Sequence, residues 1–560
     1  MSPQVSNSAP ANPSACAVSP ARRWLVAGSW TAFVVALLFY AGSVLRVDPM
    51  RTELTNLDPR PDAVEYFALA RSLLSTGAAE IRIGDEILPS RYPVGFPVLM
   101  LPWLAALPEA QALAAPVRTN QTLGLLLLVV VFAWLHRNGR SGSAGFVVLL
   151  LATIPAFTAL ARSTHSDLSG AVFVVFAFLL IAGGLRTNRS GPIFLAAALL
   201  GLALNIRLQL IFFAPVLLAM ALLPRTGSWA GWFARCAACL AVYLVCTLPT
   251  FILNFATFGH PLETGYHFWV PGATGAGRTF NLQFVAPNLR LLWQEFTLTW
   301  SGFRSANLSG GGAYFLPTFI VLAVLGALRL RPSRLLLCGG LAVGVFSIGA
   351  LTYFFLDVRL YFPLLALAPL AMSGLIEDWA RPPTLGARFA RAKNVVVAAL
   401  VALSVVGVPS IAGYPDLRFT TQSLHALRWP TKRYPGWNER ILTRFLHAPE
   451  VAPGVVLSDL SPVYLNALLP AGYAAAPVDE RHDYQGTPRW HYDGHSAARL
   501  VQAAWQKHQP IYAIALTQAE AESLIARLPR IDGTEWRVFL PADPLAPGVV
   551  LRLSRSRADE

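Results

Sequence analysis

Two acidic residues and a tyrosine stand near the start of a short helical pattern that follows the first long apolar stretch. Asp62 and Glu65 precede Tyr66, and the amphipathic run ends at Gly77. A carboxylate in such a place can accept a proton from a hydroxyl group that is held within hydrogen-bond distance. Asp, with an ordinary pKa of about 3.9, is a weak base, so its effect would come mainly from positioning. We predict that Asp62 is a general base, with Asp167 and Glu65 as further catalytic candidates.

Other polar residues lie, like Asp62, at turns or helix ends between apolar stretches. Arginines at such places can hold a phosphate group through charge-assisted hydrogen bonds. The phosphate-binding set that we predict comprises Arg91, Arg207, Arg359 and Tyr361. The residues that we expect in substrate-binding loops are Tyr66, Tyr92, His260, Glu263, Tyr266 and His267.

Several of these residues also have an ordinary structural interpretation. Asp62 and Asp167 could be helix caps, because Asp is favoured at that position. Glu65 could belong to a solvated helix face, and Arg91 could extend along apolar surface toward water. Arg207 has the stronger functional argument, since a charge at a break within an apolar run is costly in lipid.

The composition indicates a membrane protein. The chain has 560 residues, of which 55% are hydrophobic and 13% are charged, whereas about a quarter are charged in soluble domains. Apolar stretches of roughly 17–21 residues recur through the first three quarters and are long enough to cross a bilayer as helices. The basic residues behind the net charge of +14 concentrate in every second loop, which is the pattern that orients membrane proteins. Because no compact basic face emerges, we predict no nucleic-acid partner.

The predicted fold class is a polytopic α-helical membrane protein with about eleven transmembrane helices in residues 21–412. A Pro/Ser/Ala-rich tail, residues 1–20, is expected to be disordered and cytoplasmic. The expected outside loops are 47–118 and 254–312. The expected spans are 24–45, 119–135, 144–160, 169–185, 192–205, 208–223, 236–253, 313–329, 335–355, 360–376 and 394–412.

The stretch 192–223 allows two interpretations. Arg207 would form a tight outside turn between two short helices, or it would lie within one long tilted helix. The long helix would place the basic loop 377–393 outside, so we reject it. The prolines in the short apolar segment that ends at Leu107 favour an interfacial or re-entrant piece.

The composition changes after residue 412. Residues 413–560 are rich in Pro, Trp, Tyr, Asp and His and contain no run of membrane length. The runs 454–458 and 511–516 predict buried strands, and 517–528 predicts a helix that begins at a Thr cap. This pattern predicts a soluble extracytoplasmic α/β domain of normal size, and we expect it to help select a substrate.

The sequence predicts no cofactor. It contains no visible Gly-rich nucleotide-binding loop. The loosely spaced residues His482, Asp483, His491, Asp493 and His495 are more typical of solvated surface than of zinc ligands. We therefore predict no metal site, while a divalent cation beside the candidate carboxylates is left open.

Five stretches, taken in order, resemble one superfamily of membrane enzymes. They are 62–77, 91–97, 161–167, 254–266 and 357–363. Together they resemble the GT-C glycosyltransferases, in the branch of protein O-mannosyltransferases and bacterial aminoarabinose transferases. The resemblance covers about residues 20–412. The chain departs from it at Ala63, where many relatives carry a second acidic residue, and this departure weakens the argument for a metal bridge.

The resemblance implies an inverting glycosyltransferase. A sugar would arrive as a polyprenyl-phosphate ester, and a hydroxyl acceptor deprotonated by Asp62 would attack it on the extracytoplasmic face. The acceptor could be a protein, a lipid glycan or a cell-wall polymer, and the bilayer is the other implied partner. The Arg, Ala, Leu and Pro content suggests a bacterium, hence an inner (cytoplasmic) membrane with a cytoplasmic N-terminus and a periplasmic C-terminal domain.

Two other function classes remain open at this point. A transporter would carry charges inside its spans and show repeat symmetry between its halves. A non-catalytic envelope assembly protein would use the C-terminal domain for binding and would not need Asp62.

Overall fold

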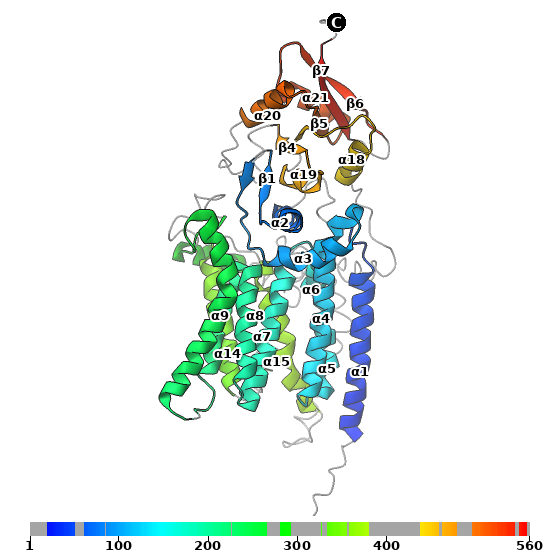
Figure 1. The fold of residues 1–560 in the computed structure, drawn as a ribbon. Helices are drawn as coiled ribbons and strands as arrows, with labels where there is room; N and C mark the ends of the chain where they lie inside the picture. The colour runs from blue at the N-terminus through cyan, green and yellow to red at the C-terminus, as the bar shows by residue number, and fades with distance from the viewer. Residues whose placement is uncertain are drawn as a thin grey trace, which may run out of the picture.

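The structure is a computed structural model. It describes residues 20–50, 61–84, 86–225, 227–265, 280–292, 326, 333–354, 358–379, 437–458, 462–478, 495–543 and 548–556. In Figure 1 the apolar helices stand side by side as a bundle, and a β-sheet with its own helices lies beyond one end of that bundle. Helix α2 and a small hairpin lie between these two parts.

Five helical segments in the described ranges are long and apolar enough to cross a membrane, by length and composition. They are Arg22–Leu45, Glu109–Arg137, Asp167–Thr187, Trp229–Phe258 and Arg334–Thr352. They contain α1 (Pro20–Tyr40) with the π-helical turn η1 (Ala41–Leu45), the 3-10 helix η3 (Glu109–Ala114) with α4 (Ala115–Arg137), α7 (Asp167–Thr187), α9 (Trp229–Phe258) and α14 (Ser333–Thr352). In the described ranges the bundle also contains shorter apolar helices, among them α5 (Ser141–Thr153), α8 (Gly191–Ile206) and α15 (Phe362–Trp379).

Part of the predicted topology falls outside the described residues. This holds for the expected spans 313–329, apart from residue 326, and 394–412, and for residues 1–19 of the expected tail. The total of about eleven spans therefore stays a prediction.

Two of the expected spans contain or adjoin a backbone break. The single helix expected over 144–160 is wrong, because α5 ends at Thr153 and α6 (Pro155–Ala161) begins after an extended Ile154. Proline lacks a backbone donor and disfavours helical geometry in the residue before it. The break expected at Arg207 is present: this residue is extended (φ −148°, ψ 122°) between α8 and the 3-10 helix η4 (Leu208–Met220).

A glycine allows α1 and α5 to approach closely. A Cβ atom added to Gly145 would lie 1.6 Å from the carbonyl oxygen of Ser29. The backbone N–H of Gly145 donates a 2.8 Å hydrogen bond to the Ser29 hydroxyl oxygen. Such contacts through small residues are typical of helices packed in membranes, where apolar burial alone does not drive association.

The segment between α1 and α4 forms the layer next to the bundle. It contains α2 (Pro61–Thr76), an antiparallel pair of β1 (Ile81–Ile83) and β2 (Glu86–Leu88), and α3 (Gly95–Ala106). Figure 1 shows α3 running across the end of the bundle. The interfacial or re-entrant placement expected for the segment that ends at Leu107 stays a prediction.

The C-terminal part is an α/β unit with a five-stranded sheet of order β4-β3-β5-β7-β6. Its parallel strands are β3 (Val455–Ser458), β4 (Ala474–Pro477) and β5 (Ile511–Ala515), and β6 (Thr534–Leu540) and β7 (Val549–Arg555) are antiparallel. Its helices are α18 (Trp437–Leu446), α19 (Pro462–Leu468), α20 (His495–Gln506) and α21 (Gln518–Arg527). The two predicted strands and the Thr cap are confirmed: Thr517 accepts a 3.2 Å hydrogen bond from the Glu520 N–H.

Helix α2 and the C-terminal sheet share one hydrophobic core. Every residue from Ala63 to Ala70 is buried, because α3 packs on one side of α2 and α19 on another. Arg71 Nε donates to the Ala467 carbonyl at 3.2 Å, and Asn466 Nδ2 donates to the Arg82 carbonyl at 3.0 Å. The segment between α1 and α4 and the C-terminal unit therefore pack against each other through a shared core, and the domain bounds expected at 413–560 stay a prediction.

Candidate active site

Asp62 lies in the first turn of α2 and is partly buried. Its Oδ1 atom accepts a 2.5 Å hydrogen bond from the Tyr92 hydroxyl, which comes from the segment between β2 and α3. This hydrogen bond fixes the direction in which the carboxylate points. Tyr92, predicted as a substrate-loop residue, is therefore a direct partner of the predicted base.

Tyr66 joins α2 to the short loop that precedes α7. Its hydroxyl oxygen lies 2.8 Å from that of Ser166, and its ring packs edge-to-face on Phe96 of α3 with centroids 5.2 Å apart. Burial raises the pKa of Tyr66 above its ordinary value, so the phenol keeps its proton at neutral pH. The helix that carries Asp62 is thereby fixed to the residue immediately before Asp167.

Asp167 and Arg207 form an ion pair across two separate segments. Asp167 begins α7, and Arg207 occupies the break between α8 and η4. With its amide oxygen turned toward Arg207, Gln209 accepts hydrogen bonds of 2.7 and 2.9 Å from that guanidinium. The other carboxylate oxygen of Asp167, Oδ2, is buried and has no hydrogen-bond partner among the described residues. That oxygen is an open acceptor position on a buried carboxylate.

Asn120 of α4 holds the loop before Asp167 in place. Its side-chain NH₂ donates to the carbonyls of Ser163 (2.9 Å) and His165 (2.8 Å). Its side-chain oxygen accepts a 2.8 Å bond from Ser169 of α7. Asn120 was not predicted as a site residue, because the sequence does not indicate which loop a polar residue of an apolar helix contacts.

Glu65 and Arg91 form a buried ion pair. The side-chain exposed fractions are 0% for Glu65 and 2% for Arg91. Glu65 accepts further bonds from the Ser90 hydroxyl (3.0 Å) and the Arg91 N–H (2.9 Å). The prediction gave Glu65 a catalytic role and Arg91 a phosphate-binding role, whereas here each satisfies the charge of the other. A solvated face for Glu65 is wrong, since its side chain is fully buried.

Two glycines bring separate loops into contact around this pair. A Cβ on Gly95 would lie 2.4 Å from the carbonyl oxygen of Asn205, which is two residues before Arg207. A Cβ on Gly265 would lie 1.9 Å from the Ser90 carbonyl oxygen. The segment 90–95 therefore touches both the end of α8 and the segment after α9, and larger residues at Gly95 and Gly265 would push these segments apart.

The other predicted site residues are not joined to Asp62 by the contacts that the structure describes. Tyr361 packs its ring against Phe346 of α14, with centroids 5.7 Å apart. His260 and Glu263 are exposed just after α9. The side chains of Arg359, Tyr266 and His267 lie outside the described residues.

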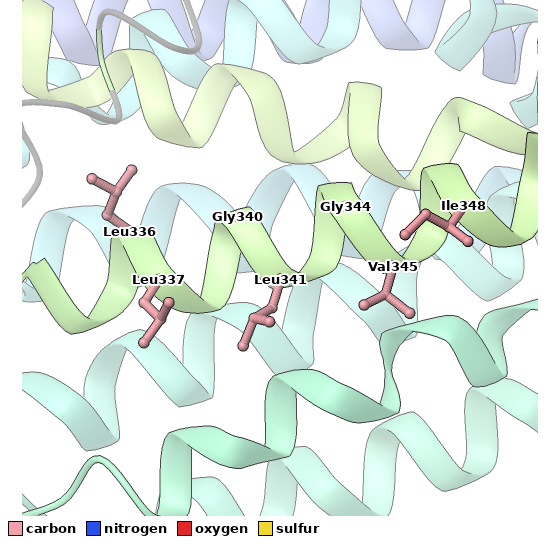
Figure 2. Close-up of a pocket in the computed structure, with 7 residues that line it drawn as sticks. All are labelled: Leu336, Leu337, Gly340, Leu341, Gly344, Val345 and Ile348. Carbon is pink, nitrogen blue, oxygen red and sulfur yellow. The ribbon is translucent and has the colours of Figure 1, made fainter. Parts of the chain in front are cut away.

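No cluster of candidate metal ligands is found in the described ranges. They hold no group of three or more His, Cys, Asp or Glu side chains suited to a metal ion. They do hold an apolar groove of about 550 Å³ along α14, which Figure 2 shows with its lining residues on one helix. Those residues are Leu336, Leu337, Gly340, Leu341, Gly344, Val345 and Ile348. They are all apolar, so the groove offers no side chain for chemistry.

Comparison with known proteins finds similarity in structure and not in sequence families. No protein-family model matches the chain, and no curated protein matches it. A solved structure of ArnT from Cupriavidus metallidurans bound to undecaprenyl phosphate matches with a TM-score of 0.57 and 17% identity, covering 94% of this chain and 98% of ArnT. The apo state of ArnT matches with a TM-score of 0.56 and 18% identity, covering 95% and 98%.

An oligosaccharyltransferase from Archaeoglobus fulgidus, tethered to an acceptor peptide, matches with a TM-score of 0.47 and 12% identity, covering 95% of this chain and 74% of that chain. The ArnT likeness extends over nearly the whole of both chains, and it includes the bundle, the outer layer and the C-terminal unit. The chain therefore has a GT-C-like fold, as the resemblance in the sequence predicted.

Proposed function

We propose that this protein is an inverting glycosyltransferase that moves a sugar from a polyprenyl-phosphate donor to a hydroxyl acceptor. One observation carries the proposal. The loop with Asp62 and the loop with Asp167 are joined by the hydrogen bond between Tyr66 and Ser166. Two carboxylates from separate segments are thus held on one set of connected elements, next to the membrane bundle. The ArnT structure with undecaprenyl phosphate supports a lipid-phosphate donor for this fold.

In the proposed reaction Asp62 accepts the proton of the acceptor hydroxyl. The acceptor oxygen then forms a bond to the anomeric carbon of the sugar. The bond from that carbon to the phosphate oxygen breaks on the opposite face, and polyprenyl phosphate leaves with the electron pair. Tyr92 keeps the Asp62 carboxylate oriented, which is how a weak base contributes to such a step.

The ion pair of Asp167 and Arg207 supplies charged groups near Asp62. The Asp167–Arg207 pair leaves Asp167 Oδ2 available to accept a hydrogen bond from a sugar or acceptor hydroxyl. We assign Glu65 and Arg91 a positioning role, because each is buried and paired with the other. The Glu65–Arg91 pair thereby holds Ser90 and Arg91 in position against Gly265 and Tyr92.

We place the reaction on the extracytoplasmic face of a bacterial inner membrane. The support is the positive-inside distribution of arginines, which puts the loops with Asp62 and Asp167 outside the cytoplasm. The C-terminal unit lies on the same side as α2 (Figure 1) and is proposed to help select the acceptor. Its shared core with α2 makes point substitutions a better test of this role than deletion of the unit.

The test uses purified full-length protein in liposomes with a panel of radiolabelled polyprenyl-phosphate sugars. Native membrane extract supplies acceptors. We expect label to move from one donor to an extractable product, with release of one polyprenyl phosphate for each sugar transferred. Folded protein that transfers from no donor in a broad panel, but takes up solutes in the same liposomes, would contradict the proposal in favour of a transporter.

A further inference from the structure

Two arginines at the outer end of the bundle have only neutral partners. Arg118 lies in the first turn of α4, and its Nη1 donates a 3.1 Å hydrogen bond to Gln121 Oε1. Arg162 follows α6, and its Nη1 donates a 3.2 Å bond to the Ser43 carbonyl. Both side chains are partly buried. Across the described ranges neither guanidinium forms an ion pair.

A continuous polar network connects the two arginines. Gln121 uses its Oε1 for Arg118 and donates from Nε2 to the Val44 carbonyl at 2.9 Å. Val44 is the neighbour of Ser43, whose carbonyl accepts from Arg162. Both carbonyls belong to η1, the π-helical turn that ends α1. Such turns occur frequently at functional sites.

The charges of the outer layer make these two arginines different from the predicted phosphate ligands. Arg91 is paired with Glu65, and Arg207 is paired with Asp167. Each of those positive charges is therefore already compensated by an acid. Arg118 and Arg162 are not compensated in this way, so they remain available to an anion.

The chemistry of a guanidinium suits a phosphate group. Each guanidinium has five N–H donors in a planar fork, and here each uses one of them. Leaving a partly buried charge without an opposite charge is unfavourable, and burial lowers the pKa of Arg162. A phosphate could accept from both arginines in a bidentate manner. The network lies where α1 with η1 ends and α4 begins, next to α6. This is the end of the bundle that α3 crosses in Figure 1, at the level expected for lipid headgroups.

We propose that Arg118 and Arg162 form a second anion site, which binds the phosphate ester of a membrane lipid in the outer leaflet. The lipid is either the polyprenyl-phosphate donor or another phosphate-bearing lipid of that leaflet. The donor case deepens the proposed function and rests on it. The binding test below contains no transfer step, so its failure and the failure of the proposed function are distinguishable.

The test measures lipid binding to full-length protein in neutral phosphatidylcholine nanodiscs. The probes are undecaprenyl phosphate and phosphatidic acid, and the variants are Arg118→Gln, Arg162→Gln and the double substitution. Loss of one charge-assisted contact is expected to weaken binding about tenfold. Arg82→Gln is the matched control, because Arg82 is an exposed arginine of β1. Weakening for undecaprenyl phosphate alone assigns the donor, and equal weakening for both probes assigns a general phosphate-lipid site.

A second measurement does not depend on the folding of a variant. Wild-type protein is treated with phenylglyoxal, which modifies arginines, with and without each lipid, and the modified peptides are identified by mass spectrometry. We expect lipid to protect Arg118 and Arg162 and to leave Arg82 reactive. Wild-type-like binding by the double variant, or no protection of either arginine by either lipid, would overturn the proposal.

Discussion

The bundle and the outer part of this molecule are held together by different kinds of contact. In the bundle, helices meet through glycines and apolar side chains, as where Gly145 contacts the Ser29 carbonyl. In the outer part, a shared hydrophobic core is supplemented by buried polar contacts between segments, as in the pair of Glu65 and Arg91 and the bonds of Asn466. The residues suited to chemistry lie where these two parts meet. This contrast suggests that the bundle supplies a scaffold and that the polar outer layer sets the geometry of the site.

The largest effect on stability is expected from breaking the buried ion pair of the outer layer. Arg91→Ala leaves the Glu65 carboxylate buried without its partner, which should cost about 3–5 kcal/mol. The measurement is thermal and denaturant unfolding in detergent, with the exposed Arg82→Ala as control. The double change to Gln at both Glu65 and Arg91 should recover part of the loss. A stability of Arg91→Ala equal to that of Arg82→Ala would contradict the importance of this pair.

The matching test in the bundle concerns close helix packing. Gly145→Ala should destabilise the protein by about 1–3 kcal/mol, because the added methyl meets the backbone of α1. Gly344→Ala is the control, since a Cβ at Gly344 of α14 meets nothing within 4 Å. Alanine has the higher helix propensity, so this control should be neutral or slightly stabilising. The free energy of unfolding is measured for both variants. Equal values for Gly145→Ala and Gly344→Ala would mean that α1 and α5 can move apart without loss of stability.

A similar effect is expected at the contact between β1 and the C-terminal unit. Asn466→Ala removes the donor to the Arg82 carbonyl and both bonds to Ala475, at a cost of about 1–3 kcal/mol. Hydrogen exchange should rise in α2 as well as in α19, because they share a core. Gln518→Ala, at an exposed position of α21, serves as control. Faster exchange confined to α19 would show that the two parts are not coupled.

The smallest effect on folding is expected at Tyr92, where the consequence should be catalytic. Tyr92→Phe removes the hydrogen bond to Asp62 and keeps the ring, so stability should change little. Transfer should fall about tenfold, which corresponds to one hydrogen bond of about 1.4 kcal/mol. Tyr66→Phe is the comparison, since its hydroxyl contacts Ser166 and not the base. An equal loss of transfer rate in Tyr92→Phe and Tyr66→Phe would indicate that the whole site has become less rigid. It would argue against a specific role for Tyr92.

The sequence allowed much of the fold to be predicted. Hydropathy located α1, α4, α7, α9 and α14, and the cost of a charge in lipid located the break at Arg207. The break at Pro155 was not predicted, because the apolar run continues through it. The shared core of α2 and α19 was missed because helix α2 and the C-terminal strands are hundreds of positions apart, and single-sequence periodicity carries no information on such contacts.

The candidate site was predictable only in part. The residue types and their positions predicted Asp62, Asp167 and Arg207 as site residues. In the structure Asp167 and Arg207 form an ion pair. The partners of the charges were not predictable, because an ion pair such as Glu65 with Arg91 depends on how two loops fold against each other. The roles of Ser166 and Asn120 were missed for the same reason, since a single hydroxyl or amide gives no pattern in sequence.

The most direct test of the central claim is single-turnover sugar transfer by Asp62→Asn beside wild-type protein. Both proteins are loaded with the same polyprenyl-phosphate sugar, so that donor binding is measured before acceptor is added. Asp532→Asn, an exposed change in the C-terminal unit, is the control for loss of a carboxylate. We predict normal donor binding and a rate of transfer about 10²–10⁴-fold lower in Asp62→Asn. Transfer at the wild-type rate by Asp62→Asn would contradict the account and place the base elsewhere.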